Sequence, residues 1–234
     1  MSSKIMDVHN HTIWSDGAHT VEEVIENAIN NKVDIIGISD HFNTIKCDSV
    51  LTAQLDKYIK ALVKEKEKYK DKIEVLAGIE ICMNKDWCEL DNLPYDKLNK
   101  LDYVLFEYID WFPSSVNLKE IKSYASRITC KKGLAHTNIF SLIKKYGMSK
   151  VIKLMKENEL FWEINVNRGY EYFDYIIMNS HKSQVIEVFN KLKKNKIKIT
   201  VGSDTHSLWY YDVNRIMIGN ELASTYDVAN INIE

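Results

Sequence analysis

A regular alternation of short apolar runs with longer helical patterns is the feature that most constrains this chain. Residues 33–39 (VDIIGIS) are continuous and β-branched, as expected for a strand that is buried on both faces. Seven runs are predicted strands: 5–8, 33–39, 73–79, 103–106, 133–135, 160–166 and 197–202. A predicted helix follows each of the first six, in 20–31, 49–71, 91–100, 118–130, 149–158 and 180–195.

The first of these helices carries a start signal. Thr20 is followed three residues later by Glu23, the spacing of a capping box. Strands that alternate with helices in this way favour parallel pairing with right-handed crossovers. Two architectures satisfy that rule, a closed barrel and a doubly wound open sheet.

Polar residues at the strand ends favour the barrel. They are His9 and His11 after the first strand, His41 after the second, Glu80 after the third, His136 after the fifth, and Asp204 with His206 after the seventh. The carboxyl ends of parallel barrel strands share one rim, and that rim holds the active site. We therefore predict an α/β fold, a distorted seven-stranded TIM-like (β/α) barrel, in which these side chains converge. With only two prolines and eight glycines, no linker stands out, and 1–234 is predicted to form a single domain.

The chemistry of these side chains indicates divalent metal ions. Neutral imidazole and carboxylate are ligands of Zn, Mn and Fe, and a carboxylate can bridge two ions. His9 and His11 are two residues apart, as are Asp204 and His206, so each pair can face one side of its strand. A lone histidine would more often be an ordinary core or surface residue. The repeated pairs favour the metal interpretation.

Five segments, in this order along the chain, resemble the PHP family, named for polymerase and histidinol phosphatase: DVHNHTIWSDG, GISDH, AGIEI, LAHTN and GSDTH. The resemblance implies a distorted seven-stranded barrel that hydrolyses phosphate esters with two to three divalent ions (Zn, Mn or Fe). It assigns His9, His11, Glu80 and Asp204 to one ion. A second ion would take Asp16, His41 and His136, and a third would take Glu80, His206 and one further ligand.

That further ligand is where the chain departs from the family. The segment DYVLFEYID places Ile109 where the family usually has a histidine. Glu107 and Asp110 are the nearby carboxylates, and strand alternation puts Glu107 on the same side as Ile109. Glu107 is therefore the preferred substitute ligand, and both two ions and three remain open.

For such a metal site we predict attack on phosphorus by a metal-activated water, without a covalent enzyme intermediate. Asp204 or His206 would help to protonate the leaving oxygen. Arg168, just beyond the sixth strand, is the predicted phosphate contact because a guanidinium can grip phosphate with two donors. Asn165, together with Asn167, is predicted to line the same pocket, whereas Glu163 is expected to serve the fold.

Other residues are weaker candidates. His19 and His181 are expected to be exposed. The aromatic segments 110–113 and 208–211 are expected either to wall the pocket or to pack. The tail after His206, with the apolar stretch 216–218, is expected to close the barrel or to meet a partner.

The amino-acid composition limits the kinds of binding partner that we expect. The net charge of −2 argues against duplex nucleic acid. No long apolar run or signal peptide is present, and the four cysteines lack a C-x-x-C spacing, so a cytoplasmic enzyme with free thiols and no membrane contact is expected.

The leading hypothesis is a histidinol-phosphatase-like enzyme that hydrolyses a small-molecule phosphate monoester. The alternatives are a nuclease acting on nucleotides or oligonucleotides, a non-catalytic metal-binding module, and a hydrolase of the amidohydrolase kind. No lysine suited to carbamylation follows a middle strand, which argues against the last.

Overall fold

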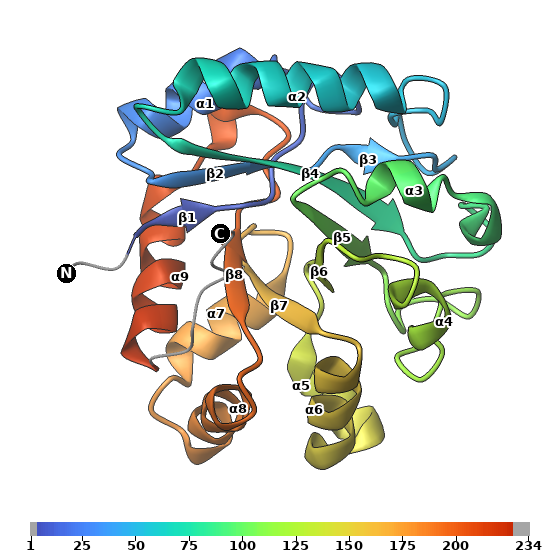
Figure 1. The fold of residues 1–234 in the computed structure, drawn as a ribbon. Helices are drawn as coiled ribbons and strands as arrows, with labels where there is room; N and C mark the ends of the chain where they lie inside the picture. Colours follow the sequence, from blue (N-terminus) through green and yellow to red (C-terminus); the bar gives the residue numbers. More distant parts are fainter. Residues whose placement is uncertain (1–3, 227–234) are drawn as a thin grey trace.

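Parallel strands form a nearly closed barrel in the computed structural model, which describes residues 4–226. The strands run around the barrel in the order β1-β2-β4-β5-β6-β7-β8 (Figure 1). They are β1 (Met6–Asp7), β2 (Ile35–Ile38), β4 (Glu74–Cys82), β5 (Tyr103–Glu107), β6 (Lys131–Leu134), β7 (Leu160–Asn165) and β8 (Ile199–Gly202). A two-residue strand, β3 (His41–Phe42), pairs with the carboxyl half of β4. The α/β barrel prediction is confirmed.

The barrel closes between its first and last strands. The Val8 amide donates to the Val201 carbonyl at 2.9 Å, and Asn10 bridges Thr205 in parallel register just beyond the strand ends. This contact excludes the open-sheet alternative and brings the carboxyl end of β8 beside that of β1.

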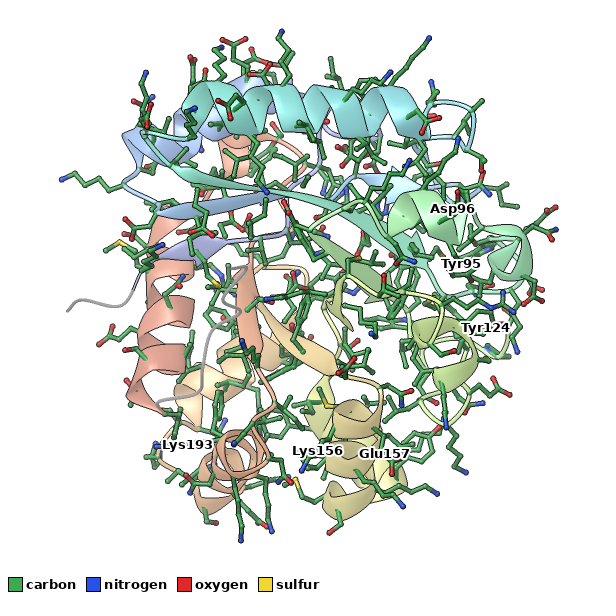
Figure 2. The ribbon with its side chains drawn as sticks, in the orientation of Figure 1. Tyr95, Asp96, Tyr124, Lys156, Glu157 and Lys193 are labelled. Carbon is green, nitrogen blue, oxygen red and sulfur yellow. The ribbon has the colours of Figure 1, made fainter. Side chains whose placement is uncertain are left out.

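Helices surround the barrel (Figure 1). They are α1 (Val21–Asn30), α2 (Leu55–Tyr69), α3 (Tyr95–Leu98), α4 (Lys122–Ala125), α5 (Ile139–Tyr146), α6 (Met148–Glu157), α7 (Glu171–Met178), α8 (Ser183–Lys194) and α9 (Val213–Thr225), with 3-10 turns η1 (Leu90–Asn92) and η2 (Leu208–Tyr210). Their apolar faces pack inward, while charged side chains such as Lys156, Glu157 and Lys193 lie on the outer surface (Figure 2). None of the helices in the described residues is long and apolar enough to cross a membrane.

An aromatic side chain fills the barrel interior, and glycines on two strands leave room for it. The Tyr103 hydroxyl donates to the Val8 carbonyl at 2.6 Å across the barrel. A Cβ at Gly37 would lie 2.4 Å from that hydroxyl oxygen, and one at Gly78 only 2.2 Å from the ring. Small residues on β2 and β4 thus let one tyrosine fill the centre of the barrel.

Several helix predictions were wrong or incomplete. The predicted helix 118–130 shrinks to α4, because the Asn99 side chain accepts from the Thr129 amide at 2.7 Å and donates to the Arg127 carbonyl at 3.0 Å. Those backbone groups are therefore not available to continue the helix. Helices α5, α7 and α9 were not predicted, although Asn138 caps α5 by accepting from two backbone amides.

The tail after His206 forms α9, which packs on β1 and β8. The Asn220 side chain accepts from the Met6 amide and donates to the Met6 carbonyl, both at 2.9 Å. Of the apolar stretch 216–218, Ile216 is buried while Met217 and Ile218 are exposed. The tail therefore helps to close the barrel. All four cysteines are free.

Candidate metal centre

Histidine and carboxylate side chains converge at the carboxyl ends of the strands. The set contains every predicted metal ligand: His9 and His11 after β1, Asp16 in the loop before α1, His41 on β3, Glu80 on β4, Glu107 at the end of β5, His136 after β6, and Asp204 with His206 after β8. All are buried except Asp16 and His206, whose side chains are 28% and 38% exposed. Three overlapping clusters can be distinguished.

The first cluster contains His9, His11, Glu80 and Asp204. His9 Nε2 lies 3.3 Å from Glu80 Oε1, and His11 Nε2 lies 3.1 Å from Asp204 Oδ1. The two Nε2 atoms are 3.1 Å apart, so the His-x-His pair points both imidazoles at one place. This grouping matches the one that the resemblance implied.

The second cluster contains His11, Asp16, His41 and His206. His206 Nε2 lies 3.4 Å from Asp16 Oδ1, and the His206 ring stacks on His11 at 4.1 Å. The structure thus places His206, and not His136, beside Asp16 and His41. The reason is barrel closure: β8 adjoins β1, so a residue after β8 reaches the loop after β1.

The third cluster contains His41, Glu80, Glu107 and His136. His136 Nε2 lies 3.2 Å from Glu80 Oε1 and 3.7 Å from Glu107 Oε2. Its strand, β6, adjoins β5, which explains why His136 meets the β5 carboxylate. A side chain outside the predicted set, Lys46, reaches the same carboxylate, with Nζ 2.9 Å from Glu107 Oε2.

The two carboxylates at the end of β5 and just beyond it, Glu107 and Asp110, point in different directions. Glu107 points into the site, as strand alternation indicated. Ile109 is buried in the core. Asp110 faces away, accepting from the Leu118 amide at 2.8 Å and from Lys145 at 2.7 Å.

The donor atoms fit divalent ions. Five buried atoms in these clusters have no hydrogen-bond partner: His11 Nδ1, His41 Nδ1, both Glu80 carboxylate oxygens and His136 Nδ1. His41 Nδ1 lies 2.9 Å from Glu80 Oε2, but without hydrogen-bond alignment. Buried polar atoms are otherwise almost always paired, so convergent unpaired lone pairs are those expected of metal ligands.

Electrostatics supports the same conclusion. Burial lowers the pKa of His9, but Glu163 and the other nearby carboxylates outweigh it and raise that pKa well above its usual range. Burial also lowers the pKa of His136, yet Glu107 and Glu80 raise it to about 10. By contrast, burial and the neighbouring His41 lower the pKa of His11 to about 3. The site attracts positive charge, and metal ions can supply it in place of protons.

Glu163 does more than serve the fold. It is fully buried, and its Oε1 lies 2.7 Å from His9 Nδ1, while its Oε2 accepts from the His136 amide at 2.5 Å. A carboxylate on the far nitrogen of an imidazole fixes the ring and leaves Nε2 to face a metal. Gly202 makes room, since a Cβ there would lie 2.0 Å from Glu163 Oε1. The sequence signal was the inward alternation of Glu163 on its strand.

Backbone conformation also orients the ligands. Asp204 (φ 52°), His136 (φ 29°) and Tyr108 (φ 60°) follow strand ends with positive φ angles, which are uncommon for residues with a side chain. Such conformations concentrate at functional sites, where surrounding contacts hold them. Here the turns direct Asp204 and His136 back into the barrel mouth.

A cavity of about 440 Å³ opens beside the metal centre, lined by Asn167, Arg168, Asp204 and His206 among others. The exposed Arg168 guanidinium pairs with Asp212 at 2.7 Å. Asn165 does not line this cavity. Its side chain is fully buried. The side-chain amide nitrogen donates to Glu163 Oε2 at 3.3 Å, and the side-chain oxygen accepts from the backbone amide of Asn167 at 3.0 Å. Of the two asparagines that we expected there, only Asn167 lines this cavity.

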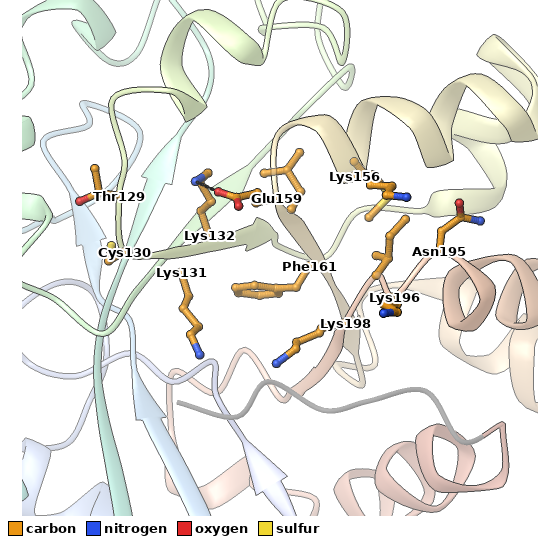
Figure 3. A pocket seen from close by; sticks show the side chains of 13 residues that line it. Thr129, Cys130, Lys131, Lys132, Lys156, Glu159, Phe161, Asn195, Lys196 and Lys198 are labelled. Atoms are coloured by element: carbon orange, nitrogen blue, oxygen red, sulfur yellow. Dashed lines mark ion pairs between the residues drawn. The ribbon is translucent and has the colours of Figure 1, made fainter. Parts of the chain in front are cut away.

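A second cavity, of about 490 Å³, lies at the other end of the barrel near the starts of β6, β7 and β8 (Figure 3). Its lining includes Lys131, Lys132, Lys196 and Lys198 around Phe161. It contains none of the predicted ligands, so we do not assign the active site there.

The remaining candidates take no part in the clusters. His19 is half-buried against Trp209, with its Nδ1 4.0 Å from Glu23, and His181 is exposed. The aromatic segments divide: Trp111 contacts the rings of His136 and Tyr170 at the rim, whereas Tyr210 lines the cavity.

The PHP domain profile matches residues 7–183. The chain belongs to the PHP family. A probable phosphatase of Caldicellulosiruptor saccharolyticus is 27% identical over 226 residues, covering 95% of this chain and 87% of the relative. The DNA polymerase/3'-5' exonuclease PolX of Bacillus subtilis is 31% identical over 177 residues, covering 69% of this chain but only 29% of the polymerase.

Two solved structures share the fold. Histidinol phosphate phosphatase of Lactococcus lactis, solved with zinc, L-histidinol and phosphate, has a TM-score of 0.65 at 16% identity and covers 98% of this chain and 96% of its own. A putative histidinol phosphatase of Listeria monocytogenes has a TM-score of 0.60 at 16% identity, covering 94% and 99%. Membership of the PHP family and the similarity to the probable phosphatase of C. saccharolyticus mark the chain as an enzyme, a phosphatase-type hydrolase.

Proposed function

We propose that this PHP enzyme hydrolyses the phosphate monoester of a small molecule with at least two divalent metal ions. The observation that carries the proposal is the convergence of buried, unpaired imidazole and carboxylate atoms beside a cavity that contains a guanidinium. The relatives add support, because a solved neighbour was crystallised with zinc and phosphate.

Two clusters would hold ions. His9, His11, Glu80 and Asp204 would hold one, and Asp16, His41 and His206 the other. Zn, Mn and Fe all accept such ligands. When bound, paired ions lower the pKa of a coordinated water towards about 7 and neutralise charge on the phosphoryl oxygens.

Side chains at the boundary of the cavity would position the phosphate. Arg168 can exchange its partner Asp212 for a phosphate oxygen, because its side chain is 80% exposed and reorients freely. Asn167 lines the same cavity and donates to the Asp204 carbonyl at 3.1 Å, which holds the ligand loop in place. Arg168→Lys should raise KM more than it lowers kcat, because a lysine cannot make the two-pronged contact.

Asp204 and His206 both border the cavity, so either could deliver a proton to the leaving oxygen. Substrates with different leaving groups distinguish a proton donor from a metal ligand. Loss of a proton donor should reduce hydrolysis of an alkyl phosphate far more than that of p-nitrophenyl phosphate, whose phenolate leaves unprotonated. Asp204→Asn and His206→Gln, each checked for metal content, distinguish the donor from a ligand whose loss harms both substrates alike.

The deciding experiment combines elemental analysis with turnover. Protein purified without chelator or nickel should contain about two to three equivalents of Zn, Mn or Fe. It should release phosphate from monoesters such as histidinol phosphate, and removal of the ions should abolish release. Metal content near zero after reconstitution would refute the metal centre. Bound metal without turnover of any phosphoester would instead favour the non-catalytic module.

A nuclease remains the second candidate because of the similarity to the polymerase and exonuclease of B. subtilis. The net charge of −2 argues against long polymers. Short oligonucleotides should therefore be assayed beside the monoesters, and faster cleavage of the oligonucleotides would overturn the monoesterase assignment.

A further inference from the structure

Lys46 lies where no sequence feature predicted a functional residue. It belongs to the segment between β3 and α2, and its ammonium enters the third cluster, which contains His41, Glu80, Glu107 and His136. Nζ lies 2.9 Å and 3.2 Å from the two Glu107 oxygens, so it contacts both at once. The Tyr108 hydroxyl at 3.3 Å and His41 Nε2 at 3.5 Å complete its surroundings.

The contact is built into the fold. The side chain of Lys46 is 20% exposed, and Glu107 is fully buried. The segment that carries Lys46 is anchored by the Ile45 amide, which donates to the Trp87 carbonyl at 3.0 Å. It is also held by a hydrogen bond from the Ser49 hydroxyl to the Thr44 carbonyl at 3.0 Å. The ammonium of Lys46 also lies over the Tyr108 ring, with Nζ 4.8 Å from the ring centroid.

The ammonium and a metal ion would compete for the same oxygens. A divalent ion coordinates a carboxylate oxygen at about 2.0–2.2 Å. An ion held by Glu107 and His136 would therefore lie close to the Lys46 ammonium, and two cations at such a distance repel strongly where water is excluded.

The polar side chain at the end of β5, which is Glu107 rather than a histidine, fits this arrangement. A neutral histidine could ligate a metal but could not neutralise an ammonium, whereas a glutamate can. Glu107 is the carboxylate of the metal centre with which Lys46 pairs in the described residues.

We propose that Lys46 is a built-in cation that takes the place of a third metal ion, so that the working site contains two metal ions and one ammonium. This inference rests on the metal-binding part of the proposed function. The first and second clusters keep their ions. Glu107 then serves to hold Lys46 rather than to ligate metal.

Metal stoichiometry tests the proposal without reference to activity. After saturation with zinc and gel filtration, the wild-type protein should retain about two equivalents, and Lys46→Met should retain about three, because the freed Glu107, Glu80 and His136 can then bind an ion. Lys46→Arg keeps the charge and should stay at the wild-type value. Lys145→Met, which breaks a lysine–carboxylate pair outside the site, is the matched control and should also leave the value unchanged.

Glu107→Gln provides a second, independent arm. If Glu107 binds only Lys46, this variant should keep the wild-type number of ions, and adding it to Lys46→Met should abolish the third ion. A wild-type protein with three ions, a loss of one ion in Glu107→Gln, or a folded Lys46→Met variant still at two would each overturn the proposal. Absence of metal from every variant would instead refute the proposed function itself.

Discussion

At the scale of single residues, the buried carboxylate behind His9 should control metal affinity. In Glu163→Gln the side chain can still accept from the His136 amide, but its charge no longer fixes the His9 imidazole. Loss of such an outer partner typically weakens metal binding by about 10- to 100-fold. Competition with a chromogenic chelator measures the change. Glu159→Gln, an exposed acid near the other end of the barrel, should bind zinc as the wild type does.

The same residues should make metal binding depend on pH. The raised pKa values of His9 and His136, the latter about 10, mean that these imidazoles carry protons at neutral pH in the metal-free protein. Metal must displace those protons, so apparent affinity should rise from pH 6 to 8 and fall on acidification. Calorimetry in two buffers of different ionisation enthalpy counts the released protons. Heats that do not depend on the buffer would contradict this expectation.

The candidate ligands could be picked out from the sequence because strand ends mark them, but the way in which they group in space could not. His136 and His206 both follow strands, and only the neighbours of those strands decide which carboxylate each one meets. The order of the strands is set when the barrel closes. The sequence therefore could not show that His206 joins Asp16 and His41 while His136 joins Glu107. Lys46 gave no signal, since a loop lysine resembles many solvated ones.

At the scale of elements, the strands were easier to predict than the helices. Continuous β-branched runs mark buried strands, whereas α7 and α9 lack polar faces distinct enough to give a clear period. Where a start signal existed, as at Thr20, the prediction was confirmed. The Glu23 amide donates to Thr20 Oγ1 at 3.2 Å, and the Thr20 amide donates back to Glu23 Oε2 at 2.7 Å.

This cap should contribute measurably to stability. Thr20 is exposed, so Thr20→Ala leaves no cavity. It removes the hydroxyl, which accepts from the Glu23 amide at 3.2 Å and donates to Glu23 Oε2 at 2.8 Å, together with an exposed methyl group. The expected loss is about 1 kcal/mol in the free energy of unfolding. Urea denaturation of the metal-free protein measures it, and Thr20→Ser, which keeps the hydroxyl, should retain most of the stability. Equal losses in both variants would show that the cap is not the cause.

At the scale of the whole molecule, the contacts that close the barrel both stabilise the fold and position the side chains of the metal centre. The pairing of β1 with β8 sets His9 and His11 beside Asp204 and His206, and α9 supports that seam through Asn220. In Asn220→Ala the Met6 amide and carbonyl lose buried partners, which should lower the free energy of unfolding by about 1–3 kcal/mol.

Because the same seam positions ligands from both chain ends, Asn220→Ala should also weaken zinc binding, although Asn220 is not among the predicted ligands. Ser224→Ala, on the exposed face of α9, is the control and should change stability by less than about 0.5 kcal/mol. Urea denaturation with and without zinc separates the two effects, since weaker binding reduces the extra stability that zinc confers. An Asn220→Ala variant that unfolds earlier but gains the full wild-type increment from zinc would show that the backbone pair of Val8 and Val201 alone positions the ligands.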